Sequence, residues 1–187
     1  MPRIPVHTSD DAPEQSREAL QGLERRMGRL LNIHGEMAHA PVVLAAYQGI
    51  QDAITRHGSF DAKTREAIAL AVAAVDKCAY CQSAHTVGGQ AAGWSLEETV
   101  AIRNGTAELD RKLAALLAVA REIAGSTGYV TDATWQAARE AGWSDPELAE
   151  LFAHVAANLF TNYFNHYAQT EPDLPAAPGL EGWSPPG

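Results

Sequence analysis

The sequence has little cysteine and no long hydrophobic run. Two of its 187 residues are cysteines. The longest apolar run, Ala67–Val75, falls well short of the roughly 20 residues that span a bilayer. The N-terminus contains no apolar segment typical of a secretory signal. We therefore expect a cytoplasmic protein that does not enter membranes. In that compartment a pair of cysteines more often reacts or binds metal than forms a structural disulfide.

The sequence also lacks a basic surface. Its 14 lysines and arginines are outnumbered by 23 acidic residues, which gives a formal net charge of −9. The densest basic cluster is the short stretch around Arg25 and Arg26, next to Glu24. Binding to a phosphate backbone needs a positively charged face. We therefore expect no nucleic-acid partner.

No segment alternates apolar and polar residues in the manner of a strand, whereas apolar residues recur repeatedly at helical spacing. The sequence therefore predicts an all-α fold of about seven or eight helices. Residues 1–10 are expected to be a flexible arm, and residues 11–169 a single all-helical domain. Residues 170–187 hold five of the ten prolines, so this tail is expected to be extended.

Capping residues predict where the helices begin. Asp11, three residues before Glu14, is typical of a first N-cap. Pro41 suits the first turn of a second helix that ends at Gly58, and Asp61 can cap a third, from residue 62 to about 75. Further helices are expected over about 78–92, 95–103, 108–124, 131–141 and 144–169.

The sequence contains two similar segments. Ala92–Glu98 resembles Ala141–Glu147, 49 residues later, and both contain Ala-Gly-Trp-Ser. Either this is common chemistry at helix joints, with the tryptophans locking the joints, or the chain contains a duplicated helical unit. A duplication would place Val130 and Thr134 at the positions of Cys81 and His85, so one copy alone would carry the chemistry described next. The two tryptophans are Trp94 and Trp143.

Both cysteines lie in one Cys-x-x-Cys motif at the expected start of a helix. Cys78, Cys81 and His85 share one helical face, because residues three, four and seven apart point the same way. With Cβ atoms ~5–6 Å apart, the two thiols can close to a disulfide after a modest distortion. The first turn of a helix also favours the thiolate through its free N–H groups and its dipole.

Glu66 stands twelve residues before Cys78 in a helix that is otherwise almost entirely apolar. Burying such a carboxylate is costly unless it is paired or used, and a helical hairpin could fold it back toward the thiols. Together with His85 it would form a proton relay in which one sulfur attacks an electrophile and the other resolves the product as a disulfide. Two alternatives stay open, a zinc site with Glu66 as fourth ligand beside both cysteines and His85, and unreactive core thiols.

Two other polar groups are interpreted structurally. His34, Glu36 and His39 crowd together, but the spacing of the histidines is not that of a helical metal pair, so they are assigned to a helix joint. A polar stripe along the last expected helix could face a partner, although we favour a role in satisfying buried groups between helices. Its members are Asn158, Asn162, Asn165 and His166.

The spacing of Glu66, Cys78, Cys81 and His85 resembles the signature of AhpD-like alkylhydroperoxidases, which belong to the carboxymuconolactone decarboxylase superfamily. The resemblance covers about residues 38–175. It includes the His-Ala-Pro entry at 39–41, the Asn-Tyr-Phe-Asn-His-Tyr stretch at 162–167 and the Thr-Glu-Pro-Asp-Leu-Pro stretch at 170–175.

This resemblance implies an all-α homo-oligomer, built from a repeated helical unit, that reduces hydroperoxides without a metal or any other cofactor. It implies that Cys81 attacks the peroxide and Cys78 resolves the product, with Glu66 and His85 as the relay that removes the thiol proton. It also implies that a dithiol protein, lipoyl-bearing or thioredoxin-like, reduces the resulting disulfide.

The sequence departs from the family at one position. The best-known members carry a histidine directly before the second cysteine, where this chain has Tyr80. Disulfide chemistry is therefore better supported than peroxide turnover. Other members of the superfamily are decarboxylases that lack the cysteine pair. A cofactorless lyase that uses Glu66 and His85 is the corresponding alternative, and the presence of Cys78 and Cys81 argues against it.

Overall fold

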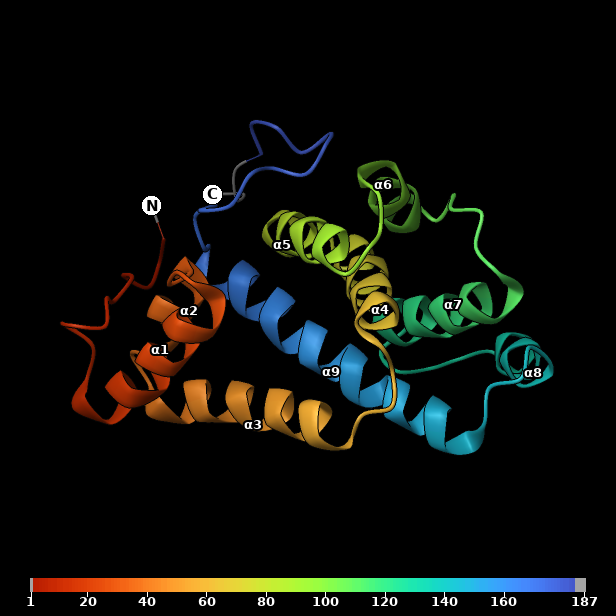
Figure 1. Cartoon of the computed structure of the whole chain (residues 1–187), viewed down its shortest axis with the longest axis horizontal. Helices are drawn as coiled ribbons and strands as arrows, with labels where there is room; N and C mark the ends of the chain where they lie inside the picture. Colours follow the sequence, from red (N-terminus) through yellow and green to blue (C-terminus); the bar gives the residue numbers. More distant parts are fainter. Residues whose placement is uncertain (1, 184–187) are drawn as a thin grey trace.

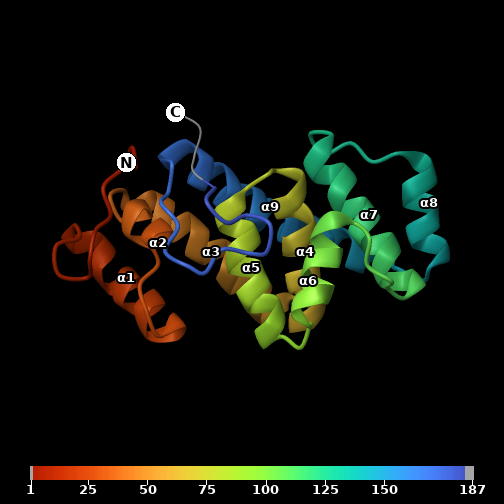
Figure 2. The same cartoon turned by 90° about the horizontal axis from the view of Figure 1, so that it is seen from above.

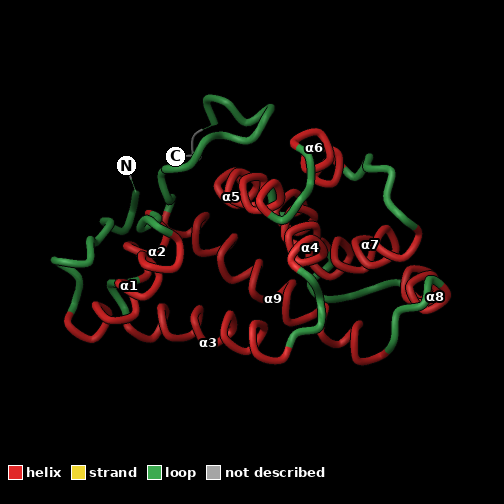
Figure 3. Tube along the Cα trace, viewed as in Figure 1, coloured by secondary structure: helices red, strands yellow, loops and turns green. Residues whose placement is uncertain are grey.

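A computed structural model describes residues 2–183, and within them the chain is entirely helical, with nine α-helices and no strand (Figures 1 and 3). The predicted all-α class is confirmed. No helix in this range is long and apolar enough to cross a membrane. The helices are α1 (Glu14–Met27), α2 (Asn32–Met37), α3 (Pro41–His57), α4 (Ala62–Val75), α5 (Ala79–Ala91), α6 (Leu96–Asn104), α7 (Arg111–Gly125), α8 (Asp132–Glu140) and α9 (Asp145–Ala168).

Helix α4 is the centre of the fold. It contacts α5, α6, α7 and α9 and lies between them in Figure 1. All residues from Ala67 to Ala73 are buried, as the apolar run predicts. Its N-cap is Asp61, whose Oδ1 accepts a hydrogen bond from the Thr64 backbone N–H at 2.7 Å. The bounds of this helix agree with the prediction from the sequence.

The core has two parts. The larger cluster joins α4, α6, α7, α8 and α9. The smaller cluster gathers side chains from α1, α2 and α3 around Cys78, Tyr80 and Cys81. In Figure 2 the N-terminal helices lie at one end of the molecule, and α7 and α8 lie at the other. The cysteine pair therefore belongs to the part of the core that the N-terminal helices cover.

The two halves of the larger cluster repeat each other. The indole N–H of Trp94 donates to the Lys63 carbonyl at 2.9 Å, and that of Trp143 donates to the Lys112 carbonyl at 2.7 Å. Each lysine ammonium lies over the ring of its tryptophan, 3.9 and 4.2 Å from the centroid. Because all these pairs are related by the same 49-residue offset, the structure supports a duplicated unit, α4–α6 and α7–α9. The same offset relates the N-caps Asp61 and Asp110, and the capping-box serines Ser95 and Ser144.

The predicted start of the first helix is wrong. Helix α1 begins at Glu14, its N-cap position is occupied by Pro13, and no side chain caps it. Asp11 instead accepts hydrogen bonds from the backbone N–H and the hydroxyl of Thr8, at 2.6 and 3.0 Å. The carboxylate of Asp11 thus closes the turn before the helix, which leaves it unable to serve as the cap.

Two other boundaries differ from the prediction. Helix α2 was not expected, because it has six residues and its N-cap, Leu31, offers no capping side chain. Helix α7 begins at Arg111, about three residues later than predicted, since Asp110 caps it by accepting from the Leu113 N–H at 3.0 Å.

Both ends of the chain dock on the helical body. In the N-terminal arm, Arg3 N–H donates to the Ala168 carbonyl at 2.8 Å and His7 N–H donates to Gly35 at 3.2 Å. The tail runs beside α5 (Figure 2), where Ala177 N–H donates to the Ser83 hydroxyl at 3.0 Å. Over residues 170–183 the tail has no helix. Residue 1 of the predicted arm and residues 184–187 of the predicted tail lie outside the described range.

Candidate active site

A sharp joint places the first cysteine at the start of α5. Lys77, between α4 and α5, has a φ of +56°, in the left-handed region that commonly ends a helix. The chain turns there so that Cys78 N–H bonds the Ala73 carbonyl at 3.0 Å. Cys78 then occupies the N-cap position of α5, and its Sγ accepts from the Cys81 backbone N–H at 3.3 Å. One sulfur therefore lies at the positive end of the helix dipole.

The two sulfurs are in direct contact. Cys78 Sγ and Cys81 Sγ are 2.6 Å apart, and both are free thiols that are almost fully buried. Hydrogen bonds from Cys81 and from His166 lower the pKa of Cys78 against the opposing effect of burial. Burial raises the pKa of Cys81, and so does the neighbouring charge on Cys78. The first negative charge on this pair is therefore favoured on Cys78.

Glu66 folds back against His85. The imidazole Nδ1 lies 2.9 Å from the carboxylate Oε2, and each side chain is 27% exposed. Burial disfavours the imidazolium, but the charge and hydrogen bond of Glu66 outweigh it and raise the pKa of His85. A glycine makes this approach feasible, because a Cβ on Gly88 would lie 2.7 Å from the same Oε2. The structure thus brings together the four residues that the sequence singled out.

The polar stripe on α9 forms the opposite wall of this site. Asn165 Nδ2 donates to Cys81 Sγ at 3.1 Å, and the imidazole of His166 hydrogen-bonds the thiol of Cys78. The interpretation that this stripe satisfies buried groups was sound, but the sequence did not reveal that those groups are the thiols. The helical spacing of Asn158, Asn162, Asn165 and His166 placed them on one face but did not indicate what that face contacts.

A second carboxylate lies behind the thiols. Asp76, at the end of α4, accepts from Asn162 Nδ2 at 2.6 Å, and burial raises its pKa. Its charge in turn contributes to the raised pKa of His166. Cys78 therefore has a second histidine beside it, His166, in addition to the Glu66–His85 pair.

A small cavity of about 130 Å³ opens beside Cys81 and His85. Cys81 lines it and Cys78 does not, so the second cysteine is the one that a ligand in the cavity would meet. The wall is largely apolar. Its other members include Met27, Leu31, Ile33, His34, Tyr47, Tyr80, Asn158 and Asn165.

Tyr80 holds the C-terminal tail through a hydrogen bond. Its hydroxyl donates to Asp173 Oδ1 at 2.7 Å. The same carboxylate accepts from Arg29 Nη2 at 3.1 Å and from the Asn32 backbone N–H at 3.0 Å. Burial, followed by the negative charge of Asp173, raises the pKa of Tyr80. At neutral pH this phenol is therefore a structural hydrogen-bond donor, in a place where the best-known relatives have a titrating histidine.

The cluster of His34, Glu36 and His39 does not form a site of its own. His34 is buried in the wall of the cavity, where burial lowers its pKa to about 4. Glu36 accepts from the Thr170 hydroxyl at 2.5 Å, and burial raises its pKa to about 7. His39 Nε2 lies 2.8 Å from the Pro5 carbonyl. These residues join α2 to the arm and the tail, in agreement with the helix-joint interpretation.

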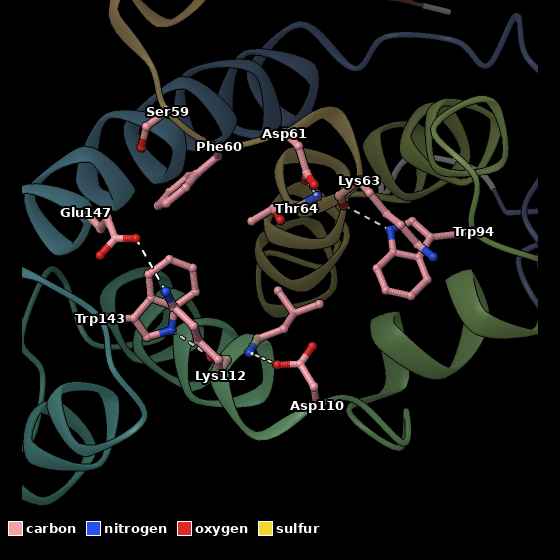
Figure 4. A pocket seen from close by; sticks show the side chains of 11 residues that line it. Ser59, Phe60, Asp61, Lys63, Thr64, Trp94, Asp110, Lys112, Trp143 and Glu147 are labelled. Atoms are coloured by element: carbon pink, nitrogen blue, oxygen red, sulfur yellow. Dashed lines mark hydrogen bonds and ion pairs between the residues drawn. The ribbon is translucent and has the colours of Figure 1, made fainter.

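A second cavity of about 550 Å³ lies between the two repeats (Figure 4). The Lys63–Trp94 and Lys112–Trp143 pairs face it from opposite sides, and Phe60 lies next to Trp143. It contains no residue of the cysteine site. Within residues 2–183, no three side chains of His, Cys, Asp or Glu converge in a manner that could hold a metal ion. The donor set that the zinc alternative requires is therefore not assembled.

Residues 41–108 match the model of the carboxymuconolactone decarboxylase family. This range contains Glu66, Cys78, Cys81 and His85. A protein of Haemophilus influenzae is 51% identical over 45 residues, which are 24% of this chain and 40% of that protein. The matched part is thus less than half of that relative's own length.

Several solved structures share the fold over almost the whole chain. A peroxidase-related protein of Ralstonia eutropha JMP134 with an alkylhydroperoxidase AhpD core has a TM-score of 0.82 and 22% identity, over 92% of each chain. A peroxidase-related protein of Silicibacter sp. TM1040 has a TM-score of 0.77 and 18% identity, over 92% of this chain and 94% of that one. A cysteine-to-alanine variant of the debrominase Bmp8, in complex with 2,3,4-tribromopyrrole, has a TM-score of 0.78 and 20% identity, over 91% of each.

Proposed function

Because residues 41–108 match the carboxymuconolactone decarboxylase family and almost the whole chain shares the fold of a protein with an AhpD core, we propose that it is a thiol-dependent oxidoreductase that reduces hydroperoxides. The observation that carries this proposal is the contact of Cys78 Sγ and Cys81 Sγ, 2.6 Å apart beside the Glu66–His85 hydrogen bond. Two free thiols at this distance can give up two electrons and become one disulfide, and the adjacent imidazole can move the protons.

The oxidative step starts at Cys81, because its sulfur faces the cavity. His85 accepts the thiol proton, helped by Glu66, which stabilises the imidazolium. The Cys81 sulfur then attacks the terminal peroxide oxygen. The O–O bond breaks, the sulfur becomes a sulfenic acid, and the alkoxide leaves as an alcohol with the proton from the imidazolium.

The second step closes the disulfide. The sulfur of Cys78 attacks the Cys81 sulfenic acid, the S–O bond breaks, and water leaves as the S–S bond forms. A dithiol protein, lipoyl-bearing or thioredoxin-like, would restore the thiols by exchange. The proposal includes a cytoplasmic location, where such reductants keep thiols reduced. It also includes a homo-oligomer, for which the exposed Val42 on α3 and Phe152 on α9 offer apolar surface.

One observation favours a second candidate with the same thiol chemistry. The wall of the cavity is largely apolar and aromatic, and the fold matches a debrominase crystallised with a brominated pyrrole. In reductive debromination the two thiols would supply two electrons. The C–Br bond would be replaced by C–H, bromide and a proton would be released, and the same Cys78–Cys81 disulfide would form.

The test of the proposed function is the consumption of cumene hydroperoxide in the presence of dithiothreitol. We expect turnover by the natural chain and its loss in Cys81→Ser. The matched control is Val130→Ser, at the equivalent position of the second repeat, which should retain activity. Conversion of a carboxymuconolactone that survives in Cys81→Ser would instead show a lyase that uses Glu66 and His85. Turnover of a bromopyrrole without turnover of the peroxide would favour the second candidate.

A further inference from the structure

The two sulfurs of the site have different surroundings. Cys81 lines the cavity and accepts a hydrogen bond from Asn165. Cys78 is absent from the cavity wall and is 1% exposed, yet it hydrogen-bonds the imidazole of His166. Helices α5 and α9 pack against each other, and His166, which directly follows Asn165 on α9, does not line the cavity. His85 lines the cavity together with Cys81.

His166 connects a buried sulfur to solvent. The residue is exposed, while Cys78 is not. Its imidazole has hydrogen bonds to the Cys78 sulfur and to the backbone of Lys77, and the negative charge of Asp76 adds to their effect on its pKa, which is raised. The imidazolium has two N–H donors and therefore suits these two partners. The charged and titratable groups around the His166 imidazole are therefore Cys78 and Asp76. Those around the Cys78 sulfur are Cys81, His166 and His85.

We propose that His166 is a second catalytic proton donor and acceptor of this site, dedicated to Cys78, and that it makes Cys78 the sulfur that leaves when a reductant opens the disulfide. This inference rests on the proposed disulfide chemistry. In thiol–disulfide exchange the better-stabilised thiolate leaves faster. The incoming sulfur must therefore attack Cys81, which is also the sulfur that faces the cavity.

A dithiol reductant opens the disulfide in two successive exchange reactions. One of its thiolates attacks Cys81 Sγ, a new S–S bond forms there, and the Cys81–Cys78 bond breaks. The electron pair of the broken bond passes to Cys78 Sγ, where the imidazolium of His166 stabilises or protonates it. The second thiol of the reductant then attacks its own sulfur in the mixed disulfide and releases Cys81. The protein gains two electrons and the reductant becomes a cyclic or intramolecular disulfide.

A thiolate titration tests the role of His166 without any peroxide. The absorbance of the thiolate near 240 nm is followed against pH in Cys81→Ser, which leaves Cys78 alone beside a hydroxyl donor, and in Cys81→Ser/His166→Gln. Because an adjacent cation lowers a thiol pKa by about one unit or more, we expect the second protein to titrate at least about one unit higher. The matched control is the same His166→Gln change in Cys78→Ser, where the remaining thiol of Cys81 should not respond. Equal titration of Cys78 with and without His166 would overturn the proposal.

If His166→Gln does not fold, the titration of the His166 ring by NMR replaces it. Its pKa should fall in Cys78→Ser relative to the natural chain, and an unchanged value would overturn the proposal.

The leaving sulfur is identified separately by reaction of the oxidised protein with 2-mercaptoethanol, followed by acid quenching and peptide mapping. We expect the adduct on Cys81, and an adduct on Cys78 would contradict the assignment. If hydroperoxides never form the Cys78–Cys81 disulfide, the proposed function fails. An oxidant such as diamide still forms this disulfide, so the reaction with 2-mercaptoethanol can be carried out in either case. The two failures are therefore distinguishable.

Discussion

The hydroxyl of Tyr80 donates a 2.7 Å hydrogen bond to Asp173, and the residue before the second cysteine thereby fastens the C-terminal tail. Leu174, next to this carboxylate, packs against the core cluster that holds both cysteines. The docked tail is thus joined to the core cluster around the thiols through Tyr80 and Leu174. This arrangement gives the departure of Tyr80 from the family pattern a structural role.

We expect Tyr80→Phe to loosen the tail without unfolding the domain. The change removes a hydrogen bond to a charged group, which is worth about 1.5–3 kcal/mol, and leaves the ring in place. Limited proteolysis should cut the tail of Tyr80→Phe several-fold faster than that of the natural chain. Tyr129→Phe is the control, since Tyr129 is 80% exposed. Equal cleavage rates for Tyr80→Phe and the natural chain would show that the hydrogen bond does not hold the tail.

Gly88→Ala should disable the Glu66–His85 relay. The new Cβ would lie 2.7 Å from Glu66 Oε2, so the carboxylate must move away from the imidazole. We expect at least a roughly tenfold loss of peroxide turnover, in line with the usual contribution of acid–base groups, together with a lower pKa of His85 by NMR. Gly49→Ala on α3, where a Cβ meets nothing within 4 Å, should keep full activity and gain up to about 1 kcal/mol of stability. An active Gly88→Ala protein with an unchanged His85 pKa would remove the relay from the mechanism.

Glu36 and His34 should give opposing pH dependences of stability. Burial raises the pKa of Glu36 to about 7, so the folded state holds a proton that the unfolded state has lost above about pH 4.5. The stabilisation from this carboxyl is complete at low pH and is lost as the pH rises through about 7. Burial lowers the pKa of His34 to about 4, so its contribution is present above about pH 6.5 and is lost as the pH falls through about 4.

Between about pH 4.5 and 6.5 both groups change the free energy of unfolding by about 1.4 kcal/mol per pH unit, in opposite directions. Their effects on the natural chain therefore cancel over this interval. Relative to the natural chain, Glu36→Gln should therefore gain stability as the pH rises through this interval, and His34→Asn should gain stability as the pH falls. Urea denaturation across this pH range measures both differences. Parallel pH profiles for the natural chain and both variants would mean that neither group titrates as its burial requires.

The duplicated tryptophans should contribute equally to stability. Trp94→Phe and Trp143→Phe each remove an indole hydrogen bond to a lysine carbonyl and weaken a cation–π contact. We expect a loss of about 2 kcal/mol from each, measured by chemical denaturation. Trp135→Phe is the control, with a change within about 0.5 kcal/mol, because Trp135 is more exposed at 38%. A loss in one of the two repeats alone would contradict the equivalence of the pairs.

Local signals were sufficient for most of the fold. Asp61, Ser95 and Ser144 cap helices where the sequence indicated, because capping is decided by residues three positions apart. The same locality explains two errors. Asp11 accepts hydrogen bonds from Thr8 in the turn before the helix, and only the folded structure shows this. Helix α2 is short and has no capping side chain, so no local pattern in the sequence predicts it.

The cysteine motif could be predicted, whereas its surroundings could not. Cys78, Cys81 and His85 are related by short spacings along one helix. The contact of Asn165 with Cys81 joins residues 84 positions apart, and that of Tyr80 with Asp173 joins residues 93 apart. Such pairs follow from the packing of α9 and the tail against α5, for which the sequence offers no local signal. The different roles proposed for Cys78 and Cys81 depend on these distant neighbours.

The most direct test of the central claim is mass spectrometry of the protein before and after one equivalent of cumene hydroperoxide, with free thiols alkylated. We expect the two alkylatable thiols, Cys78 and Cys81, to disappear together, with the loss of two hydrogen atoms and their full return after dithiothreitol. In Cys78→Ser the same treatment should stop at a sulfenic acid on Cys81, because no second sulfur can resolve it. If both thiols remain alkylatable in excess hydroperoxide, the chain is not a thiol peroxidase.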